Sequence, residues 1–197
     1  MNATTTDSSV IIIAGGASKR MGSDKRTLKL GDRSLAQHTL ELAMQLSSDI
    51  VVSCNVQIPE FEEHLVVPDL TPGGGPAEGL ISALPHIRYP NTTILSVDMP
   101  FITTGLVRRL LDRHQPREVT FFTIKGEMQP FPAIVPAGLR AAIEHAYANK
   151  ISSLKGLLSS LPSRSIPVST VEDQELFLNV NSEDDLEKAR QMYHSQA

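Results

Sequence analysis

A loop near the start of the chain carries residue types that bind polyphosphates. It follows the β-branched run at residues 10–13 and begins with Ala-Gly-Gly at residues 14–16. Glycine has no Cβ, so a ligand can lie against the main chain and its N–H groups. The loop also supplies three cations, Lys19, Arg20 and Lys25. Backbone N–H groups combined with several cations favour anionic ligands, so we predict that this loop holds a nucleoside triphosphate.

A single carboxylate, Asp98, directly follows a second apolar run, residues 92–97. Mg²⁺ is usually held by one or two carboxylates together with phosphate oxygens and waters. An aspartate also commonly forms the turn before a proline, here Pro100. The cations of the glycine loop favour the metal interpretation. We therefore predict Mg²⁺ as the cofactor and Asp98 as its ligand.

The apolar pattern predicts the elements that would bring these residues together. Strands are expected at residues 10–13, 49–54, 65–67 and 92–97, with a helix before the second strand and another before the fourth. This alternation indicates an α/β fold with a mostly parallel, doubly wound, Rossmann-like sheet and helices on both faces. Ligands bind such sheets outside the carboxyl ends of the strands. The loops after these four strands should therefore form one rim.

The second half of the chain predicts a small antiparallel addition to this sheet. Residues 118–124 and 131–135 have the pattern of a hairpin, and residues 166–168 that of an edge strand at Pro167. Residues 176–181 are also strand-like, and Ser182 should cap a terminal helix. We expect residues 1–8 to be a disordered tail and residues 9–197 a single domain.

Several weaker candidates have ordinary structural interpretations. Asn55 and Asp69 follow predicted strands, yet both residue types are frequent in turns. The glycines at 73–75 fit either a hinge or close approach by a nucleobase. Cys54 is the single cysteine, which excludes a disulfide framework and a multi-cysteine metal site, and its place at the end of an apolar run favours a buried hydrophobe over a catalytic thiol.

Composition and missing motifs narrow the function classes. The chain has 197 residues and a net charge of −4, so no basic field invites nucleic acid. Neither the P-loop nor the G-x-G-x-x-G dinucleotide motif occurs. No apolar segment approaches the ~20 residues of a membrane span, and the start does not have the pattern of a signal peptide. We therefore expect a cytoplasmic location and no membrane partner.

The chain carries an ordered series of motifs. They are Ala14-Gly15-Gly16, Arg20-Met21-Gly22, Asp24-Lys25, Asn55, Asp69, Gly75-Pro76 with Gly79, Asp98-Met99-Pro100, Gln129-Pro130, Asn179-Val180-Asn181 and Asp184-Asp185-Leu186. In this series the sequence resembles the molybdenum cofactor guanylyltransferases, the MobA-type nucleotidyltransferases. The first loop is typical of the wider nucleotidyltransferase superfamily, whereas the late Asn-Val-Asn segment favours this branch.

The resemblance implies transfer of GMP from GTP to the terminal phosphate of molybdopterin, with release of pyrophosphate and delivery of the product to molybdoenzymes or their chaperones. It implies catalytic roles for Arg20, Lys25 and Asp98, with Asp98 as the magnesium ligand. It further implies a pterin-binding role for Asn179 and Asn181. The remaining residues that it implies in nucleotide binding are Ile13, Ala14, Gly15, Gly16, Asn55, Asp69, Gly75 and Gly79.

Departures from the family pattern leave two alternatives open. Glu78 stands in the sequence Gly-Pro-Ala-Glu-Gly where Gly-Pro-Leu-Ala-Gly is common, and it places a carboxylate near the expected base loop. A related nucleotidyltransferase that uses CTP or a sugar phosphate acceptor would have the same first loop. A nucleotide-binding regulatory domain without turnover would need the loop but not a metal carboxylate at Asp98.

Overall fold

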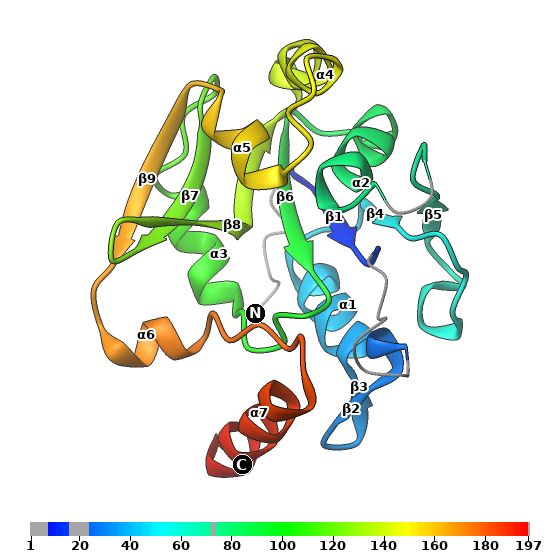
Figure 1. Cartoon of the computed structure of the whole chain (residues 1–197), viewed down its shortest axis with the longest axis vertical. Coiled ribbons are helices and arrows are strands. Elements are labelled where there is room, and N and C mark those ends of the chain that lie inside the picture. Colours follow the sequence, from blue (N-terminus) through cyan, green and yellow to red (C-terminus); the bar gives the residue numbers. More distant parts are fainter. Residues whose placement is uncertain (1–7, 16–23, 72–73, 197) are drawn as a thin grey trace.

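The computed structural model describes residues 8–15, 24–71 and 74–196, and its centre is a sheet of order β5-β4-β1-β6-β8-β7-β9 (Figure 1). Four neighbouring strands in it are parallel: β5 Leu65–Val67, β4 Ile50–Ser53, β1 Ser8–Ile13 and β6 Asn91–Ser96. The predicted α/β fold with a mostly parallel sheet is confirmed. β1 begins at Ser8, a residue that the sequence pattern assigned to the tail.

An antiparallel addition extends the sheet beyond β6. The strand β8, Glu127–Pro136, is antiparallel to both β6 and β7, Val119–Ile124. The edge strand β9, Ser163–Val168, pairs parallel with β7. A separate antiparallel pair joins β2, Lys29–Leu30, to β3, Arg33–Ser34. The predicted hairpin and the edge position of Pro167 are both confirmed.

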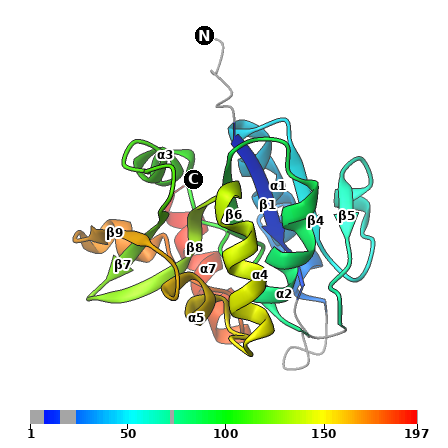
Figure 2. The ribbon, with the colours of Figure 1, turned by 90° about the horizontal axis from the view of Figure 1, so that it is seen from above.

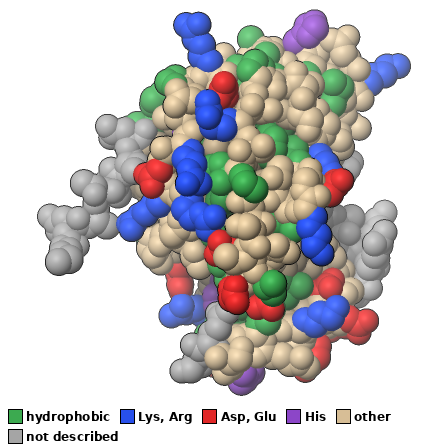
Figure 3. Space-filling model, turned by 90° about the vertical axis from the view of Figure 1, so that its left-hand side faces the viewer, with side chains coloured by type: hydrophobic (Ala, Val, Ile, Leu, Met, Phe, Trp, Pro, Cys, Tyr) green, Lys and Arg blue, Asp and Glu red, His purple; other side chains and the backbone are tan. Residues whose placement is uncertain are grey.

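Several charged side chains lie on the side of the molecule where the sheet ends at β9. Figure 3 shows this side, with Lys and Arg side chains over its middle. Arg164 on β9 forms an ion pair with Glu118, just before β7, and Lys155 forms one with Glu127 at the start of β8. Charge on an exposed edge strand disfavours pairing with a strand of another molecule.

Helices cover both faces of the sheet (Figure 2). One face carries α1 and α3, which contact each other, and the opposite face carries α2, α4 and α5. Their bounds are α1 Leu35–Leu46, α2 Pro76–Ala83, α3 Thr104–Leu111, α4 Arg140–Ala148 and α5 Leu154–Ser159. Short 3-10 helices lie at η1 Lys25–Thr27, η2 Pro59–Phe61, η3 Leu84–His86 and η4 Ala137–Leu139. No helix among the described residues is long and apolar enough to cross a membrane.

Local capping signals account for several helix starts. Ser34 accepts a hydrogen bond from the backbone N–H of Gln37, whose side chain accepts one from Ser34 N–H in return, so a capping box begins α1. Pro76 stands in the first turn of α2, as predicted from its fixed φ.

The strand predicted at residues 176–181 is wrong. After α6, Val171–Glu175, the chain forms a turn and an irregular segment that leads into α7, Glu183–Gln196. The apolar residues of this segment are buried in two different clusters. Phe177 packs in the main core, and Val180 packs in a second core beneath α7. The alternation that resembled a strand therefore reports burial, not pairing with a neighbouring strand. α7 lies at the end of the sheet toward which β1 points (Figure 1).

Close packing of α2 on β4 depends on Gly79. A Cβ at this position would overlap Ser53 Oγ and press on Ile13 Cδ1 at 3.3 Å. We expect Gly79→Ala to lower the free energy of unfolding by about 1–3 kcal/mol, because the added methyl group overpacks the core. Urea unfolding measures this change. Gly105→Ala is the helical control, since a Cβ there meets Thr103 Oγ1 only at 3.6 Å. Equal effects of the two substitutions would contradict the expectation.

Candidate active site

The carboxyl ends of the parallel strands form one rim, as the fold class predicted. Ile13, the last residue of β1, lies opposite Ser53 on one side and Ser96 on the other. Just beyond the strands, Ala14 N–H donates to Ser53 O at 2.9 Å, and Val97 N–H donates to Ile13 O at 3.3 Å. Ile13 and Ala14 are both buried. The backbone that enters the glycine loop is therefore held on both sides.

A charged cluster joins three predicted site residues that lie far apart in the sequence. Lys25 Nζ contacts Asp98 Oδ2 at 2.8 Å and donates to Asn181 Oδ1 at 3.2 Å. Ser96 Oγ donates to Asp98 Oδ1. The side chains of Lys25 and Asp98 are 15% and 14% exposed, so solvent screens their attraction less than it would on an open surface. A lysine, a carboxylate and an amide thus converge at the centre of the rim.

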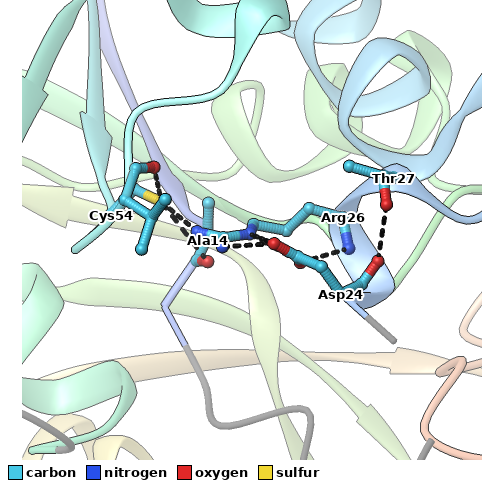
Figure 4. A network of polar contacts seen from close by, with 6 residues as sticks. Ala14, Asp24, Arg26, Thr27 and Cys54 are labelled. Carbon is cyan, nitrogen blue, oxygen red and sulfur yellow. Dashed lines mark hydrogen bonds and ion pairs between the residues drawn. The ribbon is translucent and has the colours of Figure 1, made fainter. Parts of the chain in front are cut away.

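The tight turn after the glycine loop positions Lys25. Asp24 caps η1 by accepting from Arg26 N–H at 3.1 Å, and Thr27 N–H and Oγ–H both donate to the carbonyl oxygen of Asp24. The Arg26 guanidinium contacts the Asp24 carboxylate and Cys54 Sγ (Figure 4). Arg26 therefore ties the exit of the loop to the end of β4.

The Asp24–Arg26 contact shifts the titration of both groups. Hydrogen bonding to the Arg26 side chain lowers the pKa of Asp24 below its ordinary 3.8, although burial opposes the shift. The same hydrogen bond raises the pKa of Arg26. Both groups are thus held in their charged forms. Cys54 is free and buried, in agreement with its interpretation as a small buried residue.

A second polar cluster lies beyond β4 and β5. Asn55 Nδ2 donates to Asp69 Oδ2 at 2.8 Å, and Asp69 N–H donates to Asn55 Oδ1 at 2.8 Å. Ser53 Oγ donates to Asp69 Oδ1 at 3.1 Å. A Cβ on Gly15 would lie 3.4 Å from Asp69 Oδ2. The bare backbone of Gly15 therefore lies against this cluster.

The buried side chain of Glu78 hydrogen-bonds the start of the loop that precedes α2. Its Oε1 accepts from Thr71 N–H at 2.5 Å and from Thr71 Oγ–H, while the buried Oε2 has no hydrogen-bond partner among the described residues. A side chain on Gly74 would overlap this carboxylate. Gly75 precedes α2 with φ +80°, a conformation that favours glycine. The departure from the family pattern at Glu78 is thus a buried contact within the loop.

The remaining predicted site residues are Gly16, Arg20, Asn179 and Gly79. Gly16 and Arg20 lie outside the described residues. Asn179 is exposed and lies two residues before Asn181. Gly79 lies against Ser53, beside the Asn55–Asp69 cluster.

The donor set around Asp98 suits a metal only together with a ligand. Within residues 8–15, 24–71 and 74–196, no three His, Cys, Asp or Glu side chains are placed to hold a metal ion by themselves. Mg²⁺ often takes one or two carboxylates and completes its shell with phosphate oxygens and waters. Asp98, half-buried beside a cation at the glycine loop, fits that arrangement.

The family follows from a comparison with known domains. A model of the MobA-like NTP transferase domain matches residues 10–165. The chain belongs to the MobA-like NTP transferase family. It is a nucleotidyltransferase, as its motifs implied.

Other members and neighbours of the MobA-like family show how far this likeness extends. The chain is similar to a probable molybdenum cofactor guanylyltransferase of Pelotomaculum thermopropionicum, at 30% identity over 92% of this chain and 91% of that protein. Molybdopterin-guanine dinucleotide biosynthesis protein A from Archaeoglobus fulgidus superposes with a TM-score of 0.80 at 22% identity, over 96% of this chain and all of that one.

A cytidylyltransferase has the same fold. The 2-C-methyl-D-erythritol 4-phosphate cytidylyltransferase from Thermus thermophilus superposes with a TM-score of 0.68 at 18% identity, over 94% of this chain and 98% of that one. The fold therefore does not decide the base or the acceptor.

Sequence reasoning missed the hydroxyl groups that hold the two carboxylates. Ser53 and Ser96 are the last residues of β4 and β6, and each donates to an aspartate at the rim. A polar residue that ends a buried apolar run is the signal that could have identified them. Arg26 was not among the predicted site residues, and its contacts with Asp24 and Cys54 emerge only in the folded chain.

The lowered pKa of Asp24 makes a prediction about acid stability. Ionised Asp24 stabilises the fold at pH values above its ordinary pKa, and this contribution disappears as the pH falls through the lower pKa of the folded state. The difference in urea midpoint between the wild type and Asp24→Asn should therefore be largest near about pH 7 and shrink toward about pH 3. A difference independent of pH would contradict the assignment.

Proposed function

We propose that this protein transfers GMP from GTP to the terminal phosphate of molybdopterin and releases pyrophosphate. The observation that carries the proposal is the convergence of Lys25, Asp98 and Asn181 at the end of β1. The names of its relatives, a probable molybdenum cofactor guanylyltransferase and a molybdopterin-guanine dinucleotide biosynthesis protein, support this choice of substrates.

In this proposal the nucleotide lies along the rim from β1 toward β5. The backbone from Ile13 to Gly16, with Lys25 and Arg20, binds the triphosphate, since N–H groups and cations offset its charge. The remaining nucleotide-binding residues hold base and ribose on the far side of Gly15. They are Asn55, Asp69, Gly75 and Gly79.

We further propose Mg²⁺ as the cofactor, with Asp98 as its protein ligand. When bound, the metal would neutralise charge on the triphosphate oxygens. In this structure Lys25 Nζ contacts Asp98 Oδ2, the carboxylate that would hold the metal. Nucleotide binding would redirect the ammonium group of Lys25 toward a phosphate. Ser96 would keep the other carboxylate oxygen oriented.

The chemistry needs positioning more than proton transfer. An oxygen of the molybdopterin phosphate attacks the α-phosphorus of GTP, and the bond from that phosphorus to the β-phosphate oxygen breaks. The bonding electrons leave with pyrophosphate. The attacking oxygen is already ionised near neutral pH, so no general base is required. The chain contributes Lys25, whose charge offsets the repulsion between the two anions, and Asn181, whose amide can hydrogen-bond the acceptor phosphate.

Asn179 and Asn181 are proposed to face the pterin substrate. Asn181 is held by its own N–H, which donates to Asp185 Oδ2 at 3.1 Å, and Ser182 Oγ donates to the same oxygen at 2.8 Å. Hydrogen bonds from Ser182 and Asn181 lower the pKa of Asp185, which keeps the Asp185 carboxylate ionised. We also propose a cytoplasmic location, where GTP is available, and delivery of the product to molybdoenzymes or their chaperones.

Substitution of Lys25 tests the role of the glycine loop. Lys25→Ala should lower kcat by about thirtyfold to a thousandfold, because removing one electrostatic donor costs about 2–4 kcal/mol in the transition state. Lys29→Ala is the matched control, since Lys29 is exposed on β2. Pyrophosphate release with GTP and molybdopterin is the measurement. Near wild-type turnover of Lys25→Ala would remove this residue from catalysis.

Substitution of Asp98 separates turnover from simple nucleotide binding. Asp98→Asn should lower the rate by about two orders of magnitude or more, and should weaken the dependence of the rate on Mg²⁺ concentration. Titration of activity with MgCl₂ measures both effects. Full activity of the variant at the wild-type concentration of Mg²⁺ would exclude Asp98 as the ligand.

Nucleotide and acceptor competition decides between the proposal and its nearest alternative. The wild type should release pyrophosphate from GTP in the presence of molybdopterin, and much more slowly from CTP. Turnover of CTP with a sugar phosphate would instead identify a related nucleotidyltransferase. Nucleotide binding with no turnover for any acceptor would identify a regulatory domain.

A further inference from the structure

A pocket of about 480 Å³ lies on the side of Asp98 opposite to Asn55 and Asp69. Its walls come from the β7–β8 hairpin, from α6 with the turn after it, and from α7, which lie together in the lower left of Figure 1. In the sheet order, β4 and β5 stand on one side of β1 and β6, and β8 and β7 on the other. Because β7 runs parallel to β6, its last residue Ile124 lies at the same rim as Asp98.

The pocket combines apolar walls with amide groups and with one side chain of each charge, Glu175 and Lys188. Ile124, Phe177, Leu178 and Met192 line it with apolar side chains. Three glutamines, at positions 129, 174 and 191, also line it. The hydrogen bonds that their amide nitrogens donate within the protein are long, 3.3 to 3.4 Å. Such bonds are weak, so these amides can turn to a ligand at little cost.

This combination suits a flat heteroaromatic ring. An amide offers a donor and an acceptor side by side, which matches the adjacent N–H, amino and carbonyl groups on the edge of a pterin. Apolar side chains can cover the faces of such a ring, whereas these same side chains offer no hydrogen-bond partners to the hydroxyl groups of a sugar phosphate. The volume lies within the ~300–1,000 Å³ usual for small-molecule sites.

The pocket is connected to the charged cluster by a short segment. Leu178 lines the pocket, and Asn181, three residues later, contacts Lys25. Three residues span at most about 10 Å. Val180, between them, is buried, and its N–H donates to Asp98 O at 2.8 Å. A molecule with its ring in the pocket and a phosphate on a short arm can therefore reach the site of transfer.

We infer that this pocket binds the pterin ring system of the acceptor while the acceptor phosphate extends to Lys25 and Asn181. The inference rests on the proposed function and adds a place and a recognition surface for its second substrate. Gln174 and Gln191 hydrogen-bond the edge of the pterin, and Phe177 and Leu178 contact its faces. The nucleobase of GTP lies on the other side of the rim.

The test removes two of the three amides by substitutions that leave the buried core unchanged. Gln174 is half-buried and Gln191 is exposed, so a Gln174→Leu, Gln191→Leu double variant should fold. Gln45→Leu, on the exposed face of α1, is the matched control. The chain has no tryptophan, so binding of free pterin to the full-length protein can be followed by quenching of pterin fluorescence. The double variant should bind pterin at least about tenfold more weakly, with GTP affinity within about twofold of the wild type.

Three results would overturn the assignment. They are unchanged pterin affinity in the double variant, displacement of pterin by GTP, and no saturable pterin binding to the wild type. A steady-state measurement keeps the assignment distinct from the function: the double variant should raise KM for molybdopterin and leave KM for GTP unchanged. A wild type that turns over GTP and molybdopterin, with a double variant indistinguishable from it, would refute the pocket alone. Saturable pterin binding without any GTP-dependent turnover would refute the function alone.

Discussion

The pairing of β1 with a parallel strand on each side is the constraint on which the site depends. Ile13 lies opposite Ser53 and Ser96, so three strands end at the same level. Polar residues that follow those ends then meet without any long-range electrostatic guidance. A slip of one residue in either pairing would turn every side chain of β1 to the other face of the sheet. The fully buried run in β1 therefore protects the geometry of the rim.

The Lys25–Asp98 pair adds little to stability by itself, whereas in the proposed function both of its members bind ligands. Both side chains are largely removed from water, and the cost of dehydrating two charges often offsets most of their attraction. The pair nevertheless keeps a cation and a carboxylate oriented toward the same place. A triphosphate with its metal would supply each of them with a new partner of opposite charge. Without a ligand, the ammonium group of Lys25 and the carboxylate of Asp98 therefore pair with each other.

The rim has two sides, and the C-terminal segment forms one of them. Asn55 and Asp69 lie beyond β4 and β5, whereas residues 176–181 and α7 cover the side of β8 and β7. Val180 joins the second side to Asp98 through its backbone N–H. In the proposed function, the two anionic substrates approach Lys25 from opposite directions. This arrangement suits a transfer in which no group of the protein needs to form a covalent intermediate.

Local signals were enough for the sequence to predict much of this protein. The buried run of β1, the glycines after it and Pro76 at the start of α2 each depend on near neighbours, and the parallel sheet followed from the alternation of elements. Asp98 could be placed at the rim because strand ends coincide in such a sheet.

Tertiary structure alone decided the rest. Residues 176–181 alternate like a strand because their apolar side chains enter two separate cores, and only the packing of α7 reveals this. The contact between Lys25 and Asn181 joins residues 156 positions apart. No local pattern encodes it, because its geometry is set by how α7 packs on the second core and where Val180 is buried.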